Sequence, residues 1–227
     1  MGGPTVSGEL IAMITNCHQD HKIMAWLSPA YPIGSYSFSH GLEEAITRKI
    51  VNDKETLHDW LFQILRLGLG RNDAILLSNA FRANRENLLE LGWVAEAFAG
   101  SKERHEESLQ QGLAFSKVTS FLCRSEIPQA PLPIAIGYAA KIENIGLERL
   151  LPLYLHSISA NLISAAVRFL PLGQTDGQVV LYRLFEECDK LASETIDLGL
   201  DQLANSCFLN DLGSMKHETM NTRIFRS

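Results

Sequence analysis

The sequence lacks any segment that could cross a bilayer as a helix. Proline, serine, asparagine or charged residues interrupt every apolar stretch well before about 18 residues. Residues 1–8 carry no positive side chain and lead into no long apolar run, so neither a signal peptide nor a transit peptide is indicated. Positive charge is also in deficit: the formal net charge is −6, which makes nucleic acid and membranes poor candidates for the main partner. We expect a cytoplasmic protein.

Cysteine is scarce and widely spaced. The four residues form no Cys-x-x-Cys pair and no dense framework, which is typical of reduced thiols in the cytoplasm; they are Cys17, Cys123, Cys188 and Cys207. Cys17 does lie near His18 and His21, and a thiolate with two imidazoles can bind nickel or zinc. Because no fourth ligand is nearby, we expect neither a metal nor a cofactor there, although stoichiometric metal in the purified protein would favour one.

The motifs of common enzymes are missing. No Gly-Lys pair occurs, so the chain is not a P-loop nucleotide hydrolase. His217 and Glu218 begin the motif of a helical zinc hydrolase, but Asn221 stands where the second histidine is required. No Gly-x-Ser-x-Gly elbow is present either. We expect a protein that is not an enzyme; a metal-dependent enzyme built on Cys17 and its neighbours, or on His217 and Glu218, is a rival hypothesis.

Signals for β-strands are scarce as well, since no sustained alternation of apolar and polar residues occurs. Helical spacing is found instead. Asn52 and Glu55 resemble a capping box, Ser101 can cap a later helix, and Pro152 marks either a first turn or a kink. The predicted helices cover residues 52–65, 73–81, 86–100, 101–122, 134–145, 147–169 and 179–198, with a proline-rich connection at 128–133 and a turn at 171–177. We predict an all-α protein that forms a compact multi-helix bundle in a single domain.

One connection, residues 27–44, is unusually rich in proline, glycine, serine and aromatic residues. Gly34 permits a tight turn, and Ser37 or Ser39 can cap a helix whose first turn holds Glu43 and Glu44. A well-packed loop with its aromatic side chains in the core is one interpretation. Exposed tyrosine and histidine side chains on a rigid loop would instead suit a protein interface.

The C-terminal segment, residues 210–227, is the other unusual one. It carries three cations and one anion from Lys216 onward, on a protein that is acidic overall. Its apolar residues are too few to form a core of their own, so removing residues 213–227 is expected to leave stability nearly unchanged. Either this is a frayed end, or it orders on a partner with Phe225, Met220 and the arginines as anchors.

These two segments and a third, residues 155–178, resemble the UreF family of urease accessory proteins. The likeness is to a Ser-Pro-x-x-Pro-x-Gly loop that leads into Ser-His-Gly-Leu-Glu, to a Pro-Leu-Gly-Gln-Thr-Asp-Gly-Gln turn, and to a Ser-Met-Arg-His-Glu-Thr…Arg-Leu-Phe-Arg-Ser ending. The motifs occur in the same order and span about Ile23 to Ser227. Lys216 replaces an arginine, Asn221 and Thr222 replace Tyr-Ser, and Ile224 replaces leucine.

The resemblance implies an all-helical protein, usually a homodimer, that joins the accessory protein UreD (also called UreH) and the GTPase UreG. That complex acts on the urease apoprotein and couples GTP hydrolysis by UreG to nickel insertion. We therefore divide the chain into an N-terminal extension (1–22), a helical domain (23–204) and a partner-binding tail (205–227). A helical interaction module unrelated to urease is the alternative. The predicted partner-binding residues are Tyr31, Pro32, Gly34, Tyr36, Ser39, His40, Gly41, Glu43, Gln174, Asp176, Met215, Lys216, His217, Glu218, Thr219, Arg223, Phe225 and Arg226.

Overall fold

Helices make up the architecture. A computed structural model of the protein describes residues 17–226, and within that range it contains no β-strand. Residues 17–26 are helical. The elements that follow are η1 (Ser35–Ser37), α2 (Leu42–Thr47), α3 (Lys54–Leu67), α4 (Leu69–Arg82), η2 (Arg85–Asn87), α5 (Leu88–Ala97), α6 (Lys102–Cys123), α7 (Leu132–Ile142), α8 (Leu147–Ala166), α9 (Gln174–Arg183), α10 (Phe185–Thr195), η3 (Leu200–Gln202) and α11 (Phe208–His217). The predicted all-α class is confirmed.

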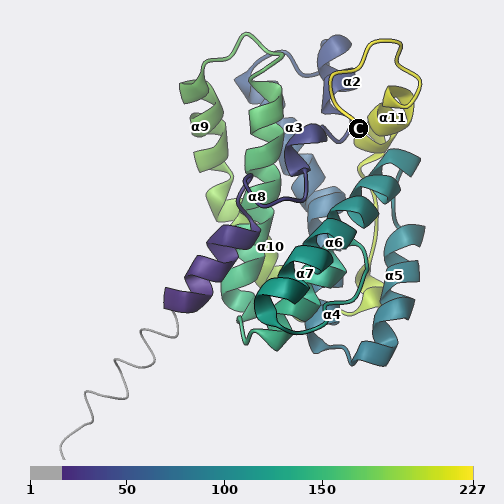
Figure 1. Ribbon diagram of the computed structural model, residues 1–227. Coiled ribbons are helices and arrows are strands. Elements are labelled where there is room, and N and C mark those ends of the chain that lie inside the picture. Colours follow the sequence, from purple (N-terminus) through teal and green to yellow (C-terminus); the bar gives the residue numbers. More distant parts are fainter. Residues whose placement is uncertain (1–16, 227) are drawn as a thin grey trace, which may run out of the picture.

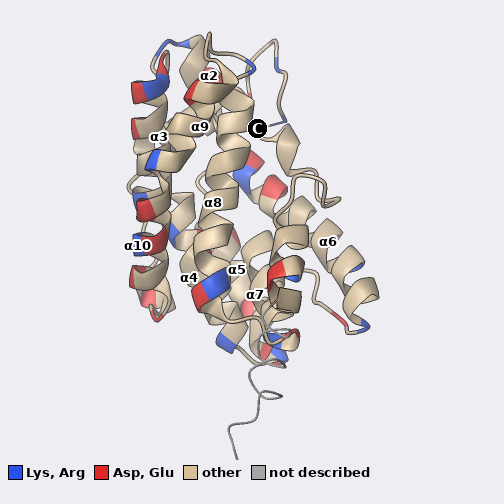
Figure 2. Ribbon diagram, turned by 90° about the vertical axis from the view of Figure 1, so that its left-hand side faces the viewer, with Lys and Arg blue, Asp and Glu red and all other residues tan. Residues whose placement is uncertain are grey.

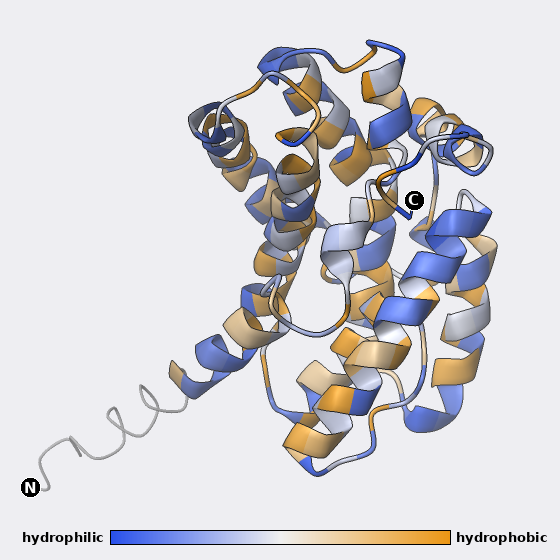
Figure 3. Ribbon diagram, turned by 45° about the horizontal axis from the view of Figure 1, so that its top comes forward, coloured by the Kyte–Doolittle hydropathy of each residue, from blue (hydrophilic) through white to orange (hydrophobic). Residues whose placement is uncertain are grey.

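The helices pack around a core to which most of them contribute (Figure 1). α9 and α10 lie on one flank beside the long α8, whereas α5 and α6 lie on the other. α2 and α11 meet at one end of the body, although about 160 residues separate them in the sequence. Most helices carry both hydrophobic and hydrophilic residues along their length, as the hydropathy colouring shows (Figure 3). This pattern is typical of helices that turn one face toward a core and the other toward solvent.

α4 and α7 pack most closely. Gly137 on α7 makes this approach possible, because a Cβ atom at that position would lie only 2.2 Å from the carbonyl oxygen of Leu77 on α4. Ile134 on α7 and Leu77 are both fully buried. A side chain at residue 137 would therefore push the two central helices apart.

Caps at helix ends agree in part with the sequence prediction. Ser101 caps α6, since its hydroxyl accepts a hydrogen bond from the Arg104 amide. The capping box of α3 was placed one residue too early: Asp53 and Thr56 form it, with the Thr56 amide 2.8 Å from Asp53 Oδ1. Asn52 precedes the cap, and its side-chain amide donates instead to the carbonyl oxygen of Lys49.

Two boundary predictions were wrong around α9 and α10. Of the two alternatives for Pro152, the first turn is excluded because this residue lies farther inside α8, and a kink is the alternative that is left. The predicted turn at 171–177 ends early, because α9 already begins at Gln174. The predicted helix over 179–198 is two helices, α9 and α10, which join at Leu184; the buried Leu184 packs into the core there. Apolar spacing continues across this junction, so periodicity alone does not reveal the break.

Charged residues of both signs occur along α3 and α10 (Figure 2). Arg66 on α3 pairs with Glu187 on α10 at 3.1 Å and with Glu194 at 2.5 Å, and Arg183 on α9 pairs with Glu55 on α3 at 2.8 Å. None of the helices in the described part of the chain is long and apolar enough to cross a membrane.

Two helical glycines provide a test of this packing. We expect Gly137→Ala to lower the free energy of unfolding by about 1–3 kcal/mol, because the added methyl group collides with the α4 backbone. Gly92→Ala on α5 is the matched control: its Cβ atom would meet only Pro131 Cδ, at 4.0 Å. This variant is expected to be as stable as the original or more stable by up to about 1 kcal/mol, since alanine favours helix. Urea denaturation measures both, and equal effects would contradict the packing argument.

Candidate partner-binding site

The C-terminal segment packs against the body of the protein. α11 lies against α2 (Figure 1), and the approach is so close that a Cβ atom on Gly41 would be 2.6 Å from the backbone nitrogen of Ser214. Gly41 also has a φ of +74°, which glycine adopts readily. His217 is fully buried and Phe225 is only 5% exposed. The expectation that this segment has little to contribute to a core was wrong.

His217 occupies the centre of this contact, between carboxylates from two other helices. Its Nδ1 atom is 2.9 Å from Glu103 Oε2 on α6, and its Nε2 atom is 3.1 Å from Glu43 Oε2 on α2. Both ring nitrogens of His217 therefore lie within hydrogen-bonding distance of a carboxyl oxygen, one from each of the two helices. Burial raises the pKa of Glu103, and the hydrogen bond and charge of His217, with the charge of Arg223, oppose that shift only in part.

The same two carboxylates also bind the last residues of the chain. The backbone amides of Ile224 and Phe225 both donate to Glu43, with nitrogen–oxygen distances of 3.0 Å each. The Arg223 guanidinium donates to Glu103 Oε1 at 2.9 Å. Glu43 and Glu103 therefore connect α11 and the residues after it to α2 and α6. We call these four tail residues and two carboxylates the tail clasp: Glu43, Glu103, His217, Arg223, Ile224 and Phe225.

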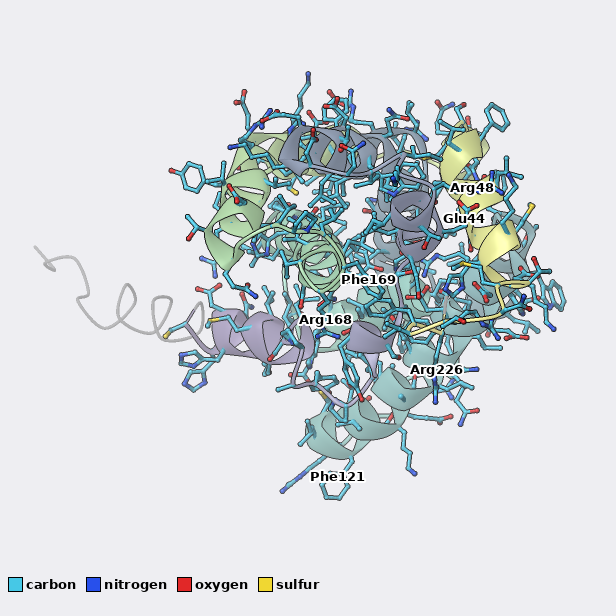
Figure 4. All side chains as sticks on the ribbon, turned by 90° about the horizontal axis from the view of Figure 1, so that it is seen from above. Glu44, Arg48, Phe121, Arg168, Phe169 and Arg226 are labelled. Carbon is cyan, nitrogen blue, oxygen red and sulfur yellow. The ribbon has the colours of Figure 1, made fainter. Side chains whose placement is uncertain are left out.

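The Phe225 side chain attaches the tail to another part of the body, the segment that follows α8. Its ring lies 5.3 Å from that of Phe169, centroid to centroid, and the Arg168 guanidinium carbon lies 6.0 Å from its centre. The next amide, that of Arg226, donates to the carbonyl oxygen of Ser37 at 2.8 Å. Figure 4 shows Arg168 and Phe169 side by side, and it shows Glu44 and Arg48, an ion pair on α2, facing α11. The end of the chain thus contacts α2, α6, the end of α8 and the 27–41 loop.

A second buried group of charges lies beneath the loop. His40 contacts Glu107 at 3.2 Å, and Asp73 accepts hydrogen bonds from Arg104 at 2.7 Å and from Tyr154 at 2.8 Å. Burial alone would raise the pKa of Glu107, but the charge and hydrogen bond of His40, together with Arg104, hold it below the ordinary value. Burial and the neighbouring Asp73 charge raise the pKa of Tyr154 well above its usual range. These contacts fix the end of the loop from which α2 begins.

Comparisons with known proteins connect this geometry to a family. A family model described as UreF matches residues 51–185, more than half of the 227-residue chain.

The chain belongs to the UreF family.

Several curated relatives extend the match to most of the chain. A protein from Roseobacter denitrificans named urease accessory protein UreF is 40% identical over 202 residues, covering 89% of this chain and 91% of the relative. One of the same name from Cereibacter sphaeroides is 42% identical over 205 residues, covering 90% and 97%. A third, from Ruegeria pomeroyi, is 37% identical over 203 residues, covering 89% and 94%. The relatives carry the names of accessory proteins, not of enzymes.

In this UreF-family chain the predicted site residues differ in how far they are exposed to solvent. The buried ones are Tyr31, Ser39, Gly41, Glu43, His217 and Phe225. The half-buried ones are Gly34, His40, Asp176, Lys216 and Glu218. The exposed ones are Pro32, Tyr36, Gln174, Met215, Thr219, Arg223 and Arg226.

Not all of these residues come together. The loop and the tail meet, but Gln174 and Asp176 begin α9, which lies on the opposite side of the molecule from α11 (Figures 1 and 4). Tyr31 points into the core, where its hydroxyl lies 2.8 Å from Thr119 Oγ1. The residue that caps α2 is Gly41, which corrects the predicted serine cap; Ser39 Oγ accepts only a long 3.4 Å bond from the Glu43 amide. For Tyr31 the core interpretation of the loop is the correct one.

Sequence reasoning missed Glu103 and an apolar surface. Glu103 lies 114 residues from His217, and no local pattern connects the two. The side of α11 that faces away from the body is apolar and exposed. We group it with two further exposed apolar side chains, Tyr36 and Ile224, whose segments are joined by the hydrogen bond from the Arg226 amide to Ser37, and call the set the tail face: Tyr36, Phe208, Leu209, Leu212, Met215 and Ile224. The spacing of Phe208, Leu212 and Met215, four and then three residues apart, is the helical signal that could have identified this face.

Potential metal ligands are not clustered in the described residues. No group of three or more histidine, cysteine, aspartate or glutamate residues between 17 and 226 is arranged to hold a metal ion. Cys17 Sγ lies 3.9 Å from His21 Nε2, and both are exposed. Cys188 and Cys207 are buried as free thiols, and burial raises the pKa of each to about 11.

The tail clasp makes a prediction about stability. We expect His217→Ala to lower the free energy of unfolding by about 3–5 kcal/mol, because it leaves two buried carboxyl groups facing each other without the ring that both of them contact. Lys216→Ala, one residue earlier and half-buried, should change it by no more than about 0.5 kcal/mol. Denaturant titration of both variants measures the difference. An unchanged stability for His217→Ala would show that the imidazole does not hold the tail.

Proposed function

We propose that the protein is a urease accessory protein that acts in the cytoplasm as a non-enzymatic scaffold for nickel insertion into the urease apoprotein. In this proposal it joins the accessory protein UreD (UreH) to the GTPase UreG. Membership of the UreF family and relatives named urease accessory protein support the urease role. One structural observation carries the scaffold role: the tail clasp holds α11 so that its apolar tail face points outward.

The buried and exposed residues have different tasks in this proposal. His217, Glu43 and Phe225 position the tail from beneath and are not themselves accessible to a partner. Phe208, Met215 and the other members of the tail face are accessible, and contiguous exposed apolar side chains are typical of protein interaction sites. Arg223 and Arg226 are exposed at the edge of this face and supply charge at its rim.

The fixed tail has an energetic advantage for partner capture. A segment that orders only on binding loses conformational entropy at that moment, and this loss weakens the complex. Here the body of the protein has already ordered the tail through two buried carboxylates. A partner that binds the tail face therefore does not have to order the tail first, and little conformational entropy is lost on binding.

The nucleotide chemistry belongs to a partner in this scheme. The chain contains no Gly-Lys phosphate loop, so we assign GTP hydrolysis to UreG and expect this protein to hold UreG in position. No step requires a metal site on this chain. A helical interaction module unrelated to urease is the alternative, and failure to co-purify with UreD and UreG would favour it.

We also propose that the protein is a homodimer. Support comes from an aromatic row across α8, α9 and α10, in which the exposed ring of Phe185 lies 5.4 Å from the half-buried ring of His156 and 5.1 Å from the exposed ring of Tyr182. Leu153 is exposed beside it and borders a groove of about 250 Å³. The row is far from the tail face, so a dimer formed there leaves the tail face free (Figures 1 and 4).

Light scattering tests the dimer. We expect a mass near twice 25.2 kDa at micromolar concentration, and we expect Phe185→Asp to shift it toward a single copy, because a charge at an apolar contact loses its hydration. Phe121→Asp is the control, since Phe121 on α6 is 83% exposed and points away from the body (Figure 4). A single-copy mass for the unmodified protein would contradict the proposal.

Co-purification with UreD and UreG tests the scaffold. Met215→Asp and Phe208→Ala are each expected to weaken the complex by about 1–3 kcal/mol while melting temperature stays the same, because both side chains are exposed in the free protein. Phe121→Ala should have no effect on either measurement. If Met215→Asp still assembles with UreD and UreG and still supports urease activation in cells, the tail face is not the binding site.

A further inference from the structure

The three side chains at the centre of the tail clasp make two contacts that each require a hydrogen atom. Glu43, Glu103 and His217 are only 4%, 8% and 0% exposed. His217 Nδ1 lies 2.9 Å from Glu103 Oε2, and His217 Nε2 lies 3.1 Å from Glu43 Oε2. Each contact is a hydrogen bond only if a hydrogen atom lies between the nitrogen and the oxygen. The two contacts therefore require two hydrogen atoms.

A count of the available hydrogen atoms shows a shortage of one. A neutral imidazole carries a hydrogen on only one of its nitrogens, and an ionised carboxylate carries none. The second hydrogen atom is therefore an additional proton, which either the ring or one of the carboxyl groups holds. With this proton the three groups together carry one negative charge, and without it they carry two.

The additional proton belongs to the contact between His217 and Glu103. Glu43 receives hydrogens from other donors, because the backbone amides of Ile224 and Phe225 donate to it at 3.0 Å each. Glu103 Oε2, in contrast, contacts only the His217 ring within residues 17–226. Without the proton, Glu103 Oε2 and His217 Nδ1 would both be hydrogen-bond acceptors, and they would face each other in a place that water does not reach.

The surroundings of Glu103 favour a bound proton. Burial raises the pKa of Glu103 most strongly and the charge of Glu218 adds to this, whereas His217 and Arg223 oppose the shift only in part. The elements packed against the ring carry further charged or titratable groups: Glu44 with Arg48, Glu107 with His40 and Arg104, Asp211, and Lys216. Because Glu107 and His40 form a second buried pair one turn along α6, an experiment has to separate their titration from that of the clasp.

We propose that one shared proton between His217 Nδ1 and Glu103 Oε2 holds the C-terminal segment on the body, and that the segment is released when this proton leaves at alkaline pH. Two buried carboxylates that share no proton favour a state in which water reaches them, and the detached tail is such a state. Acid has no such effect, because a ring with hydrogens on both nitrogens can donate to neutral carboxyl groups as well as to ionised ones. This inference rests on the proposed function in one respect: it makes the display of the tail face depend on pH.

The proton count gives the direction and the size of the pH effect. In the detached chain the histidine is neutral above about pH 6.5 and both carboxyl groups are ionised, so the additional proton is absent. The attached state holds one proton more, and the equilibrium constant for detachment therefore rises about tenfold per pH unit above that value. The rise ends where the attached state also loses the proton. Below about pH 6.5 the detached histidine binds a proton too, and the dependence disappears.

NMR on the full-length protein tests the shared proton between about pH 6.5 and pH 9. The amide signals of Ile224 and Phe225 report attachment directly, because both amides donate to Glu43 in the attached state. We expect the two signals to move together to their detached positions as the pH rises. Urea denaturation over the same range should give an unfolding equilibrium constant that rises with pH.

Glu103→Gln is the decisive variant, because it supplies the second hydrogen atom without a titratable proton. Its side-chain amide can donate to a neutral His217 ring while its oxygen accepts from Arg223, so both contacts remain hydrogen bonds throughout the pH range. We expect the tail of this variant to stay attached at about pH 9. Its unfolding equilibrium constant should rise less steeply than that of the original protein, by about a factor of ten per pH unit.

Two further glutamines on α6 are the controls. Glu106→Gln makes the same chemical change at an exposed residue three positions later, and its tail should detach over the same pH range as that of the original. Glu107→Gln removes the carboxylate that His40 contacts, and its tail should also detach as before. Circular dichroism confirms that each variant is folded.

Three results would overturn the proposal. In the first, the tail of the original protein stays attached up to about pH 9. In the second, the tail of Glu103→Gln detaches over the same range as that of the original. In the third, Glu107→Gln no longer shows the effect, which would assign the titration to the second pair. None of these results bears on the partner contact, because co-purification of Met215→Asp at neutral pH tests the tail face separately.

Discussion

The position of the C-terminal segment depends on one buried imidazole between two carboxylates. Glu43 comes from α2 and Glu103 from α6, and without a cation between them their charges would repel in a region from which water is excluded. The His217 ring lies within hydrogen-bonding distance of both, and Arg223 and two backbone amides donate to the remaining carboxyl oxygens. The close approach at Gly41, the orientation of α11 and the outward direction of its apolar side all follow from this arrangement. The same contacts therefore stabilise the tail and determine which side of α11 is exposed.

The sequence predicted the parts of the fold that depend on neighbouring residues. Ser101 caps α6 because a cap needs only an oxygen three residues before an amide, and apolar spacing located α3 because that helix presents one face to the core. The junction at Leu184 was missed because two helices with continuous apolar spacing look like one. The contacts of the candidate site could not be predicted in the same way, because they join residues that are far apart in the sequence. His217 was singled out by family resemblance, but its burial depends on Glu43 and Glu103, which are 174 and 114 residues away.

The two exposed apolar surfaces have different physical origins. The tail face is exposed because the body holds α11 by its other side, so its accessibility depends on the tail clasp. The groove of about 250 Å³ beside α5 exists because Gly92, Pro128 and Pro131 leave space between two backbone segments. The residues that follow α5 lie close to α11, since a Cβ atom on Gly100 would be 2.3 Å from Asp211 Oδ1.

The tail clasp also has a consequence for biosynthesis. Glu43 and Glu103 precede His217, Arg223, Ile224 and Phe225 in the sequence, so the ribosome adds the two carboxylates first. Until the later residues have left the ribosome, the two carboxylates lack their tail partners and the surface under α11 remains open to solvent. The nascent chain therefore cannot present a finished tail face. A chain that stops before His217, or that is cleaved there, lacks the contacts that hold α11 in place and therefore lacks the exposed apolar side of that helix.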